Sequence, residues 1–416
     1  MRLPVIFIVV LLILALIIDG IILYALGAKG VRHCKRSRIW YAISCIPFYG
    51  LLIAMFCMNP RSENDDVLPL MWIVFTFVSV YIAKALYAIF SIIGVALNKI
   101  RQQKEKAKAR RNILGYIGLG LGAVMLALLW IGVFRTRRVI DVERVRVESS
   151  RLPDAFDGYR IVQFSDAHVG TWGKDTTFIS NLVDSINGVG ADMIVFTGDI
   201  VNRRTEELRP FLNILSRLHA RDGVYSILGN HDYGDYIDWK NPAEREANNQ
   251  LLAKWEKDMG WDLLNNEYRT IRRDSANMML IGVENWGEPP FPTYGNLKKA
   301  YGPTSRYPER NLNDSNFKIL LSHNPEHWVR EVTKESNIDL TLSGHTHAMQ
   351  SMIKIGSFKW SPCVFKYKTW GGLYKNEEDG TDHQIYVNIG SGEVGMPSRV
   401  LNAYPEVTVI ELKKKS

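Results

Sequence analysis

The chain has 416 residues and a formal net charge of +8 at pH 7, a length that suits two or three domains. Residues 1–138 carry 18 Lys and Arg against 5 Asp and Glu, whereas residues 139–416 carry 33 against 38. Because the basic excess lies beside apolar segments, it indicates membrane topology and excludes a general polyanion-binding surface. We therefore expect no nucleic-acid partner.

Four apolar segments come first, at about 5–28, 39–58, 68–97 and 113–134. Each has about the ~20 residues needed to cross the hydrocarbon core of a bilayer. The first is longer than the apolar core of a cleaved signal peptide. Four such stretches in succession, separated by short charged loops, are unlike buried globular helices. The sequence therefore predicts a transmembrane region of four helices over residues 1–138.

The charged loops predict the orientation of this region. Loop 29–38 has five Lys and Arg and no acid, and loop 98–112 has seven Lys and Arg and one Glu. Loop 59–67 has one Arg against three acids. Since positive loops stay in the cytoplasm, we expect both termini outside, although three arginines after the fourth segment oppose this. The expectation is a multi-pass protein of a bacterial cytoplasmic membrane with an extracytoplasmic C-terminal domain.

Two ionisable residues, Asp19 and Lys84, lie well inside the apolar segments. If both segments start at the outer face, the two charges lie at similar depth in the bilayer. An unpaired charge at that depth is costly. We therefore expect Asp19 and Lys84 to form a pair, which acts as a structural link between helices rather than a proton relay.

From residue 139 the pattern changes to short β-rich runs with helical stretches between them, which predicts an α/β layered domain over 139–416. The expected strands are 139–147, 160–165, 193–197, 224–228, 278–283, 318–322, 340–343, 384–389 and 407–412. The expected helices are 177–187, 205–219 and 243–259.

Polar residues follow five of these apolar runs at the point where each ends. Ligands in α/β sheets gather beyond the carboxyl ends of strands, so the five runs would deliver their side chains to one place. Residues i and i+2 of an extended segment point the same way, and carboxylates with imidazoles suit Mn, Fe and Zn. The runs end in Asp166-Ala-His168, Gly198-Asp199, Gly229-Asn230-His231-Asp232, His323 and Gly344-His345-Thr-His347.

These five motifs in this order resemble the calcineurin-like metallophosphoesterase superfamily, over about residues 139–412. The sequence around residues 322–325 and 388–412 is similar to that of its bacterial membrane-anchored subgroup. The resemblance implies an α/β metallophosphoesterase domain, built as a two-sheet β-sandwich flanked by helices. It also implies two divalent metal ions as cofactors, which would be Mn, Fe or Zn.

The resemblance further implies a role for each motif residue. The first metal would be held by Asp166, His168, Asp199 and His347, and the second by Asp199, Asn230, His323 and His345. His231 would stabilise the transition state and protonate the leaving oxygen, and Asp232 would orient and charge its ring. A metal-bridging hydroxide would attack the phosphorus in line.

Two further features lie beside these motifs. Arg203 and Arg204 follow Gly-Asp closely enough to approach a substrate phosphate, and a solvated loop before the helix expected at Thr205 explains them equally well. Relatives in the subgroup follow Gly-His-x-His with two glycines, whereas this chain has Ala348 and Met349. This departure leaves the metal ligands intact and affects the shape of the adjacent substrate pocket.

The predicted function is that of a membrane-anchored metal-dependent phosphohydrolase. We expect it to cleave a phosphomonoester or phosphodiester of a lipid-linked or envelope substrate. One alternative is a nucleotide-lipid pyrophosphatase of the UDP-diacylglucosamine type, which works at the cytoplasmic face and so requires the opposite topology. Another is a membrane sensor or adaptor whose phosphoesterase domain only binds a ligand, although a complete ligand set argues against this.

Overall fold

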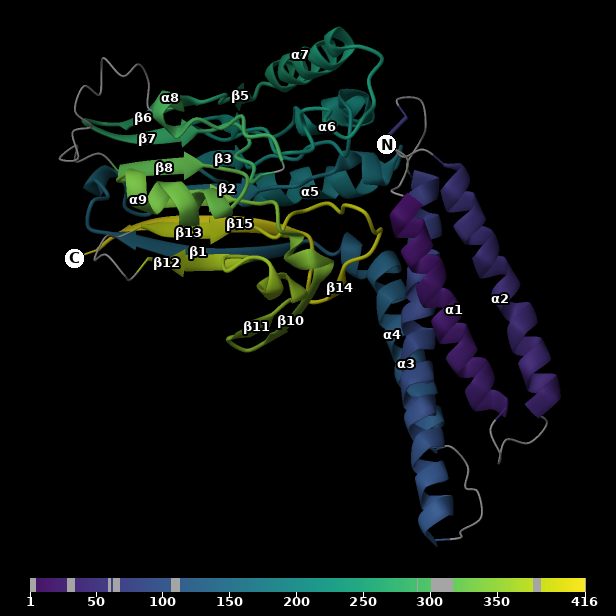
Figure 1. Cartoon of the computed structure of the whole chain (residues 1–416). Coiled ribbons are helices and arrows are strands. Elements are labelled where there is room, and N and C mark those ends of the chain that lie inside the picture. The colour runs from purple at the N-terminus through teal and green to yellow at the C-terminus, as the bar shows by residue number, and fades with distance from the viewer. Residues whose placement is uncertain are drawn as a thin grey trace. The chain divides into compact units, whose positions relative to one another are not determined.

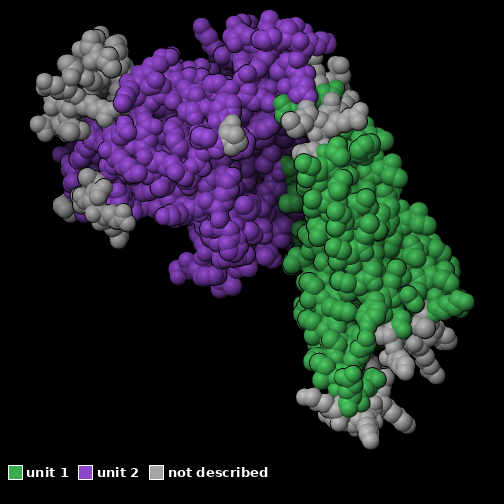
Figure 2. Space-filling model, viewed as in Figure 1, with its two compact units in different colours: residues 1–133, 395–397 green, residues 134–394, 398–416 purple. Residues whose placement is uncertain are grey.

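The computed structural model describes residues 5–27, 34–58, 61–62, 68–105, 113–289, 291–300, 317–376 and 383–415. The chain divides into two compact units (Figure 2). One comprises residues 1–133 and 395–397, and the other comprises 134–394 and 398–416. The helices are assigned by length and composition alone, which do not fix the side of the membrane on which each loop lies, so the topology stays a prediction.

The first unit contains the four predicted apolar helices (Figure 1). They are α1 (Val5–Gly27), α2 (Cys34–Cys57), α3 (Leu68–Glu105) and α4 (Ile113–Phe134). Each is long and apolar enough to cross a membrane. Helix α3 runs eight residues past the predicted end at 97, because residues 98–105 are rich in the strong helix formers Lys, Arg, Gln and Glu.

Glycines let α4 approach α3 closely. A Cβ atom on Gly122 would lie 2.6 Å from the Ala83 carbonyl oxygen, and one on Gly118 would lie 2.6 Å from the Phe90 Cβ. Gly118 and Gly122 are spaced as the small-xxx-small pattern by which membrane helices pack.

The predicted intramembrane pair is confirmed. The Lys84 ammonium lies 2.9 Å from the Asp19 carboxylate. The same carboxylate accepts hydrogen bonds from the hydroxyls of Tyr41, Tyr49 and Tyr81. Because these residues come from α1, α2 and α3, the buried Asp19 side chain links three helices through one group of polar contacts.

The second unit is a sandwich of two six-stranded sheets (Figure 1). The first sheet has the order β1-β15-β2-β3-β4-β5 and the second has β12-β13-β9-β8-β7-β6. The strands of the first sheet are β1 (Asp141–Ser149), β15 (Glu406–Lys414), β2 (Arg160–Phe164), β3 (Met193–Phe196), β4 (Val224–Ser226) and β5 (Asp262–Leu263). Those of the second are β12 (Gly372–Lys375), β13 (Gln384–Val387), β9 (Leu340–Ser343), β8 (Phe317–Leu321), β7 (Ala276–Gly282) and β6 (Glu267–Arg273).

Alternate side chains of each sheet enter different cores, as the pleat of a strand requires. In β3, Met193 and Val195 pack between the two sheets, whereas Ile194 and Phe196 pack on the outer face. Helices α5 (Thr177–Gly188) and α7 (Pro242–Asp258) cover that outer face. On the second sheet, Leu297 of α8 (Leu297–Ala300) and Val332, just before α9 (Thr333–Glu335), pack against its outer face. The expected sandwich flanked by helices is confirmed.

One local prediction was wrong. The helix expected at 205–219 is a 3-10 helix, Thr205–Phe211, followed by the short α6 (Leu212–Leu215). Pro210 has no N–H to donate within the expected helix, which explains the interruption. The predictions also lack β6, which is an edge strand of the second sheet. Ile271 is its one buried residue, so its apolar alternation is too weak to predict a strand.

A third, small sheet is also missing from the predictions. It joins β11 (Phe358–Trp360), β10 (Ser351–Ile355) and β14 (Val400–Leu401). In Figure 1 the β10–β11 hairpin projects from the two large sheets.

Candidate metal centre

Five strand ends bring the predicted polar residues together. Strands β2, β3 and β4 are parallel neighbours in the first sheet, and β8 and β9 are parallel neighbours in the second. Their carboxyl ends therefore meet at one edge of the sandwich. The side chains that follow these strands are Asp166 and His168, Asp199, Asn230 and His231, His323, and His345 and His347.

The backbone reaches this site through left-handed turns. The φ angles are 50° at Asp166, 40° at His168, 62° at Asp199, 75° at His345 and 51° at His347. The prediction that Asp166/His168 and His345/His347 converge through an extended backbone was therefore wrong. Non-glycine residues in this conformation are strained, and such strain gathers at functional sites.

Two glycines make room for the Asp199 carboxylate. Gly198 has a φ of 96°, and a Cβ there would lie 2.5 Å from the Gly229 nitrogen. A Cβ on Gly229 would lie 2.2 Å from the Asp199 Oδ1. The two loops touch backbone to backbone, so only glycine fits at these positions.

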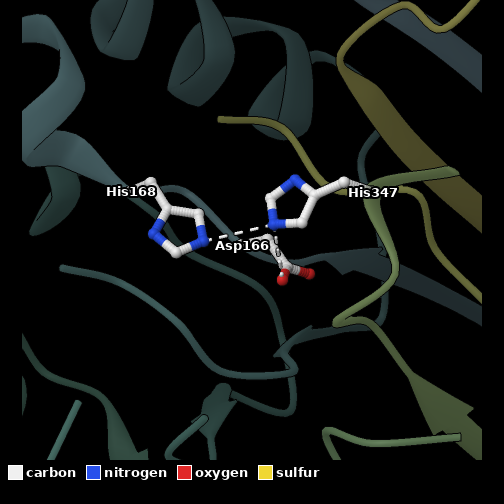
Figure 3. Close-up of side chains that lie close together, drawn as sticks. All are labelled: Asp166, His168 and His347. Carbon is white, nitrogen blue, oxygen red and sulfur yellow. Dashed lines mark hydrogen bonds and ion pairs between the residues drawn. The ribbon is translucent and has the colours of Figure 1, made fainter. Parts of the chain in front are cut away.

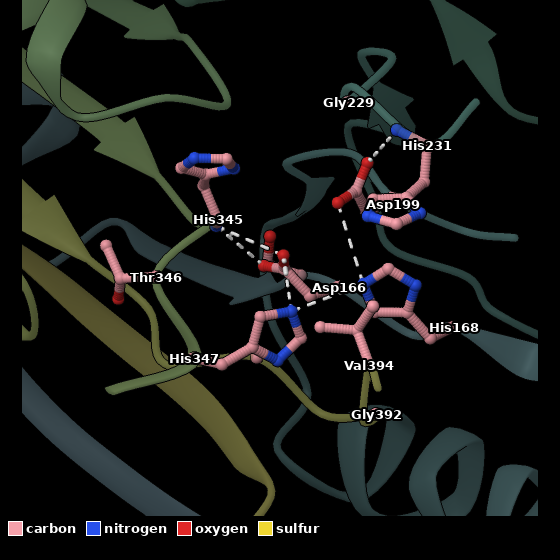
Figure 4. A network of polar contacts seen from close by, with 12 residues as sticks. Asp166, His168, Asp199, Gly229, His231, His345, Thr346, His347, Gly392 and Val394 are labelled. Atoms are coloured by element: carbon pink, nitrogen blue, oxygen red, sulfur yellow. Dashed lines mark hydrogen bonds and ion pairs between the residues drawn. The ribbon is translucent and has the colours of Figure 1, made fainter. Parts of the chain in front are cut away.

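The first cluster consists of Asp166, His168 and His347 (Figure 3). His347 Nε2 lies 3.2 Å from the Asp166 Oδ1 and 3.2 Å from the His168 Nε2. The Asp166 carboxylate also accepts the His345 backbone N–H at 3.0 Å, which leaves it oriented towards the two rings (Figure 4).

The second cluster consists of Asp199, His323 and His345. The Asp199 Oδ2 lies 3.2 Å from the His323 Nε2 and 3.6 Å from the His168 Nε2. Its Oδ1 accepts the His231 backbone N–H at 2.7 Å. A third group of possible ligands, formed by His168, Asp199 and His231, overlaps both clusters. Asp199 thus lies within reach of residues of both clusters, as a bridging ligand would.

The hydrogen bonds of the rings fit a cation at this place. His168 Nδ1 lies 3.2 Å from the Val201 carbonyl oxygen, and His323 Nδ1 lies 2.7 Å from the Thr197 carbonyl oxygen. Each Nδ1 must donate to its carbonyl, so the Nε2 of each ring is the atom turned towards the Asp199 carboxylate. A metal ion in place of a proton at these Nε2 atoms would compensate the charge of the carboxylate. The backbone carbonyls thus act as the outer partners that metal-bound histidines need.

The electrostatics of the site also favour a positive charge beside the two carboxylates. Burial lowers the pKa of His323, but the Asp199 carboxylate outweighs it and raises this pKa to about 10. Burial and the His323 charge lower the pKa of His345 to about 3. Burial raises the pKa of Asp166, but His347 outweighs it and the net shift is downward. The carboxylates stay ionised, and their field attracts positive charge.

Asn230 completes the expected second set. Its Oδ1 is buried and makes no hydrogen bond to any described residue. Its Nδ2 donates to the Tyr236 hydroxyl at 2.8 Å, so the amide orientation is set. A buried carbonyl oxygen without a partner is costly, and a metal ion would satisfy it.

His231 belongs to the group that it forms with His168 and Asp199, and it is not part of the second cluster. Its Nδ1 lies 2.6 Å from the Asn202 carbonyl oxygen, to which it donates. The ring stacks on Tyr236 at 4.4 Å and meets the His168 ring edge-on at 4.8 Å. The Nε2 is thus the ring atom left for chemistry.

Asp232 does not orient the His231 ring, contrary to the prediction. Its Oδ2 accepts the backbone N–H of Asp199 at 2.7 Å and of Gly229 at 2.8 Å. Its Oδ1 accepts those of Ile200 at 2.9 Å and Val201 at 3.2 Å. Burial and the Asp199 charge raise the pKa of Asp232 to about 7, while these N–H groups act against that rise. Asp232 ties together the two loops that carry Asp199 and Asn230.

Arg203 and Arg204 differ in exposure. Arg203 is buried and Arg204 is half-buried. The Arg203 backbone N–H and the Asn202 backbone N–H both lie near the Glu207 carboxylate, at 3.4 Å and 2.6 Å. This segment is therefore anchored, and contact of either guanidinium with a substrate stays a prediction.

The sequence reading missed two tyrosines. Tyr236 contacts both Asn230 and His231, and the Tyr367 hydroxyl lies 3.0 Å from the His345 Nε2. A hydroxyl on the outer nitrogen of a metal-binding histidine orients the ring. No local sequence pattern predicts either contact. Tyr367, for example, comes after the β10–β11 hairpin, and only the tertiary structure brings it to His345.

Comparison with known families and proteins identifies both parts of the chain. The profile described as calcineurin-like phosphoesterase matches residues 159–349. That described as a probable calcineurin-like phosphoesterase transmembrane domain matches residues 1–137. Metallophosphoesterases of the calcineurin-like kind use a dinuclear divalent metal centre, and the clusters above provide candidate ligands for one.

Individual relatives are consistent with these family matches. An uncharacterized metallophosphoesterase of Bacillus subtilis is 31% identical over 66% of this chain and 86% of its own. A transmembrane protein with a metallophosphoesterase domain from Danio rerio is 28% identical over 77% of this chain and 68% of its own. A UDP-2,3-diacylglucosamine pyrophosphatase of Chlamydia muridarum is 26% identical over 48% of this chain and 68% of its own.

Proposed function

Since this chain belongs to the calcineurin-like metallophosphoesterases, we propose that its C-terminal unit hydrolyses a lipid-linked phosphate ester at two divalent metal ions. The observation that supports this most is the convergence of imidazole nitrogens on two ionised carboxylates, with N···O distances of 3.2–3.6 Å. The ligands would be Asp166, His168, Asp199 and His347 for one ion, and Asp199, Asn230, His323 and His345 for the other.

The metal ions would supply an activated water as nucleophile and neutralise charge on the phosphoryl oxygens. The chain supplies the rest. Asp199 spans the two clusters, and the carbonyl groups of Val201 and Thr197 hold His168 and His323 with their Nε2 atoms turned inward. The site is thereby organised before substrate arrives, which is the main source of electrostatic catalysis.

His231 is the proposed general acid. Its Nδ1–H donates to the Asn202 carbonyl oxygen, so the Nε2 is the ring atom that would carry the proton to be transferred. The Nε2–H can then hydrogen-bond a phosphoryl oxygen and pass its proton to the leaving alkoxide. Tyr236, stacked on the ring, keeps the Nε2 facing the clusters. Arg203 and Arg204 would contact the substrate phosphate.

The lipid-linked substrate is supported by the membrane-spanning unit. Helix α4 ends at Phe134 and β1 begins at Asp141, so the catalytic unit is tethered by a short connection. Such a tether favours an amphiphilic substrate in the bilayer over a soluble one. We propose that the unit faces the extracytoplasmic side, from the charge distribution in the loops.

A second candidate is hydrolysis of a nucleotide-lipid pyrophosphate at the cytoplasmic face. The similarity to a UDP-2,3-diacylglucosamine pyrophosphatase favours it, and the three arginines that follow α4 would then mark a cytoplasmic end. It requires the reverse orientation of the membrane unit.

The catalytic proposal is tested with the purified full chain, loaded with Mn, Fe or Zn and given a p-nitrophenyl phosphodiester. Asp199→Asn should remove turnover and lower the bound metal, because it weakens the one ligand shared by both clusters. The matched control is Asp184→Asn, an exposed carboxylate on α5. Equal turnover in Asp199→Asn and wild type would refute the two-metal site, and absence of metal-dependent turnover in the wild type would favour a ligand-binding sensor.

The side of the membrane is tested by a cysteine added after Ser416 in a chain lacking Cys34, Cys45, Cys57 and Cys363. Intact spheroplasts are treated with an impermeant maleimide. Labelling would place the catalytic unit outside and direct the substrate search to envelope lipids. Labelling only after lysis would place it inside and favour the nucleotide-lipid pyrophosphatase.

A further inference from the structure

One segment beside the metal centre has an unusual surface. We call residues 351–368 the projecting segment; it comprises β10, β11, a short helix at Pro362–Phe365 and the residues up to Lys368. Its hairpin leaves the two large sheets in Figure 1. The segment has several large apolar side chains in solvent, among them Phe365 at 85%, Ile355 at 72% and Phe358 at 58% exposure.

The pairing of the hairpin puts its apolar residues on one face. Ile355 pairs with Phe358, and Ile353 pairs with Trp360. Because side chains alternate along a strand and face the same side across a pair, these four residues share one face. Phe358, Trp360 and Ile355 are exposed there.

The opposite face holds the lysines, and it faces the protein. Lys354 pairs with Lys359. Their ammonium groups lie 3.0 Å and 3.8 Å from the Glu143 carboxylate of β1. In the hairpin of a soluble protein, the apolar face packs on the domain and the charged face is exposed. Here the charged face packs on the domain and the apolar face is exposed. A contiguous apolar face of this kind marks an interaction site.

The charged residues around this apolar face indicate what kind of partner binds it. Between Asp339 and Glu377 the sequence has five lysines and no acidic residue. Lys366 and Lys368 are exposed next to Phe365. Aromatic and aliphatic side chains combined with lysines suit the headgroup layer of a bilayer that contains anionic lipids.

The base of the segment is fixed to the metal centre. The Ser361 hydroxyl donates to the Ala348 carbonyl oxygen at 2.6 Å, and the Tyr367 hydroxyl lies 3.0 Å from the His345 Nε2. Cys363 and Tyr367 are buried in the same small core as Ala348. The exposed apolar side chains are thus held on a rigid base.

The connection to the membrane makes such a contact reachable. At most about 25 Å of extended chain separates the end of α4 at Phe134 from the start of β1 at Asp141. The catalytic unit is therefore confined near a bilayer surface.

We propose that the projecting segment is a second membrane contact, which inserts Ile355, Phe358 and Phe365 into the headgroup layer of an anionic bilayer while Lys366 and Lys368 pair with lipid phosphates. The contact holds the base of the segment, and with it the His345 loop, at the lipid surface. The inference does not depend on which phosphate ester is hydrolysed.

The test uses the full chain in lipid nanodiscs of phosphatidylcholine with phosphatidylglycerol. Cys34 and Cys57 are replaced by serine, since Cys45 and Cys363 are buried, and a nitroxide is attached to Phe365→Cys. Its collisions with lipid-soluble oxygen and with a water-soluble nickel chelate are compared. Phe291→Cys is the matched control, an aromatic residue 56% exposed elsewhere in the same unit.

We expect the oxygen-to-nickel ratio to be several-fold higher at position 365 than at 291. The ratio at 365 should fall in phosphatidylcholine alone and in the Lys366→Glu/Lys368→Glu variant. Equal ratios at the two positions would overturn the proposal. Exclusion of both reagents from position 365 would also overturn it, because a second copy or another protein would then cover the face. Neither readout depends on turnover, so a failure here leaves the proposed hydrolase intact.

Discussion

The role of Asp232 gives the sharpest prediction, because the structure and the sequence pattern assign it different tasks. Its two oxygens accept four backbone N–H groups, two on each oxygen. In Asp232→Asn, one oxygen keeps two of these bonds, and the amide NH2 faces the other two donors. The substitution therefore leaves two buried N–H groups unsatisfied.

The magnitude follows from that count. A buried donor without a partner costs about 1–3 kcal/mol, so Asp232→Asn should lower the free energy of unfolding by about 2–6 kcal/mol. The loops that carry Asp199 and Asn230 would separate, and bound metal should fall with stability. In His231→Asn the loops keep their bonds, so we expect turnover to fall about 10²–10⁴-fold with stability and metal content unchanged.

The assay compares both variants and the exposed-site control Asp184→Asn in detergent, by thermal unfolding, metal analysis and turnover. The two variants should separate cleanly, one losing stability and metal and the other losing turnover alone. The reasoning fails if Asp232→Asn melts and binds metal like wild type but loses turnover like His231→Asn. Asp232 would then act through the His231 ring, as the resemblance to the family implies.

Four further predictions concern other parts of the chain. Asp19→Asn and Lys84→Met should each destabilise the full chain, and the double variant should show a coupling of about 0.5–3 kcal/mol; additive losses in thermal unfolding would refute the pair. Met349 has a φ of 46°, so Met349→Gly should raise stability by about 1 kcal/mol, whereas Met349→Leu should not; equal melting of both would contradict this. Burial raises the pKa of Glu256 to about 8 from 4.5, so its neutral form stabilises the fold fully below pH 4.5 and this contribution is lost as pH rises through 8. Glu256→Gln should match wild type near pH 4.5 and exceed its stability by about 2 kcal/mol or more near pH 8, and a constant difference across that range would count against it. A chelator should abolish turnover and lower the melting temperature, and divalent metal should restore both; chelator-resistant turnover would exclude a metal centre.

The departure at Ala348 and Met349 shows how local sequence and backbone are linked. These residues have φ angles of 49° and 46°, the region that glycine enters at least cost. The two glycines of the subgroup therefore suit the turn, and this chain accepts strain in their place. Ala348 is buried, whereas Met349 is exposed, so the second substitution adds an apolar side chain beside the metal loop.

The sequence by itself determined the parts of this protein that depend on local pattern. Apolar length predicts the membrane helices, and the positions of Asp19 and Lys84 along their segments predict their pair. Strand periodicity locates the five strand ends, among them those followed by Asp166, Asp199 and His323. Parallel strands place their carboxyl ends at one edge of a sheet, so these side chains are expected to meet.

Only the tertiary structure decided which atoms meet across loops. Asp232 bonds the backbone around Asp199 instead of the His231 ring, because two loops distant in sequence pack against each other. Tyr367 reaches His345 through a small sheet with no strong periodic signal. The apolar face of the projecting segment follows from strand pairing and from Glu143, which holds the lysines inward. Such contacts depend on register and loop geometry, which alternation along a chain does not encode.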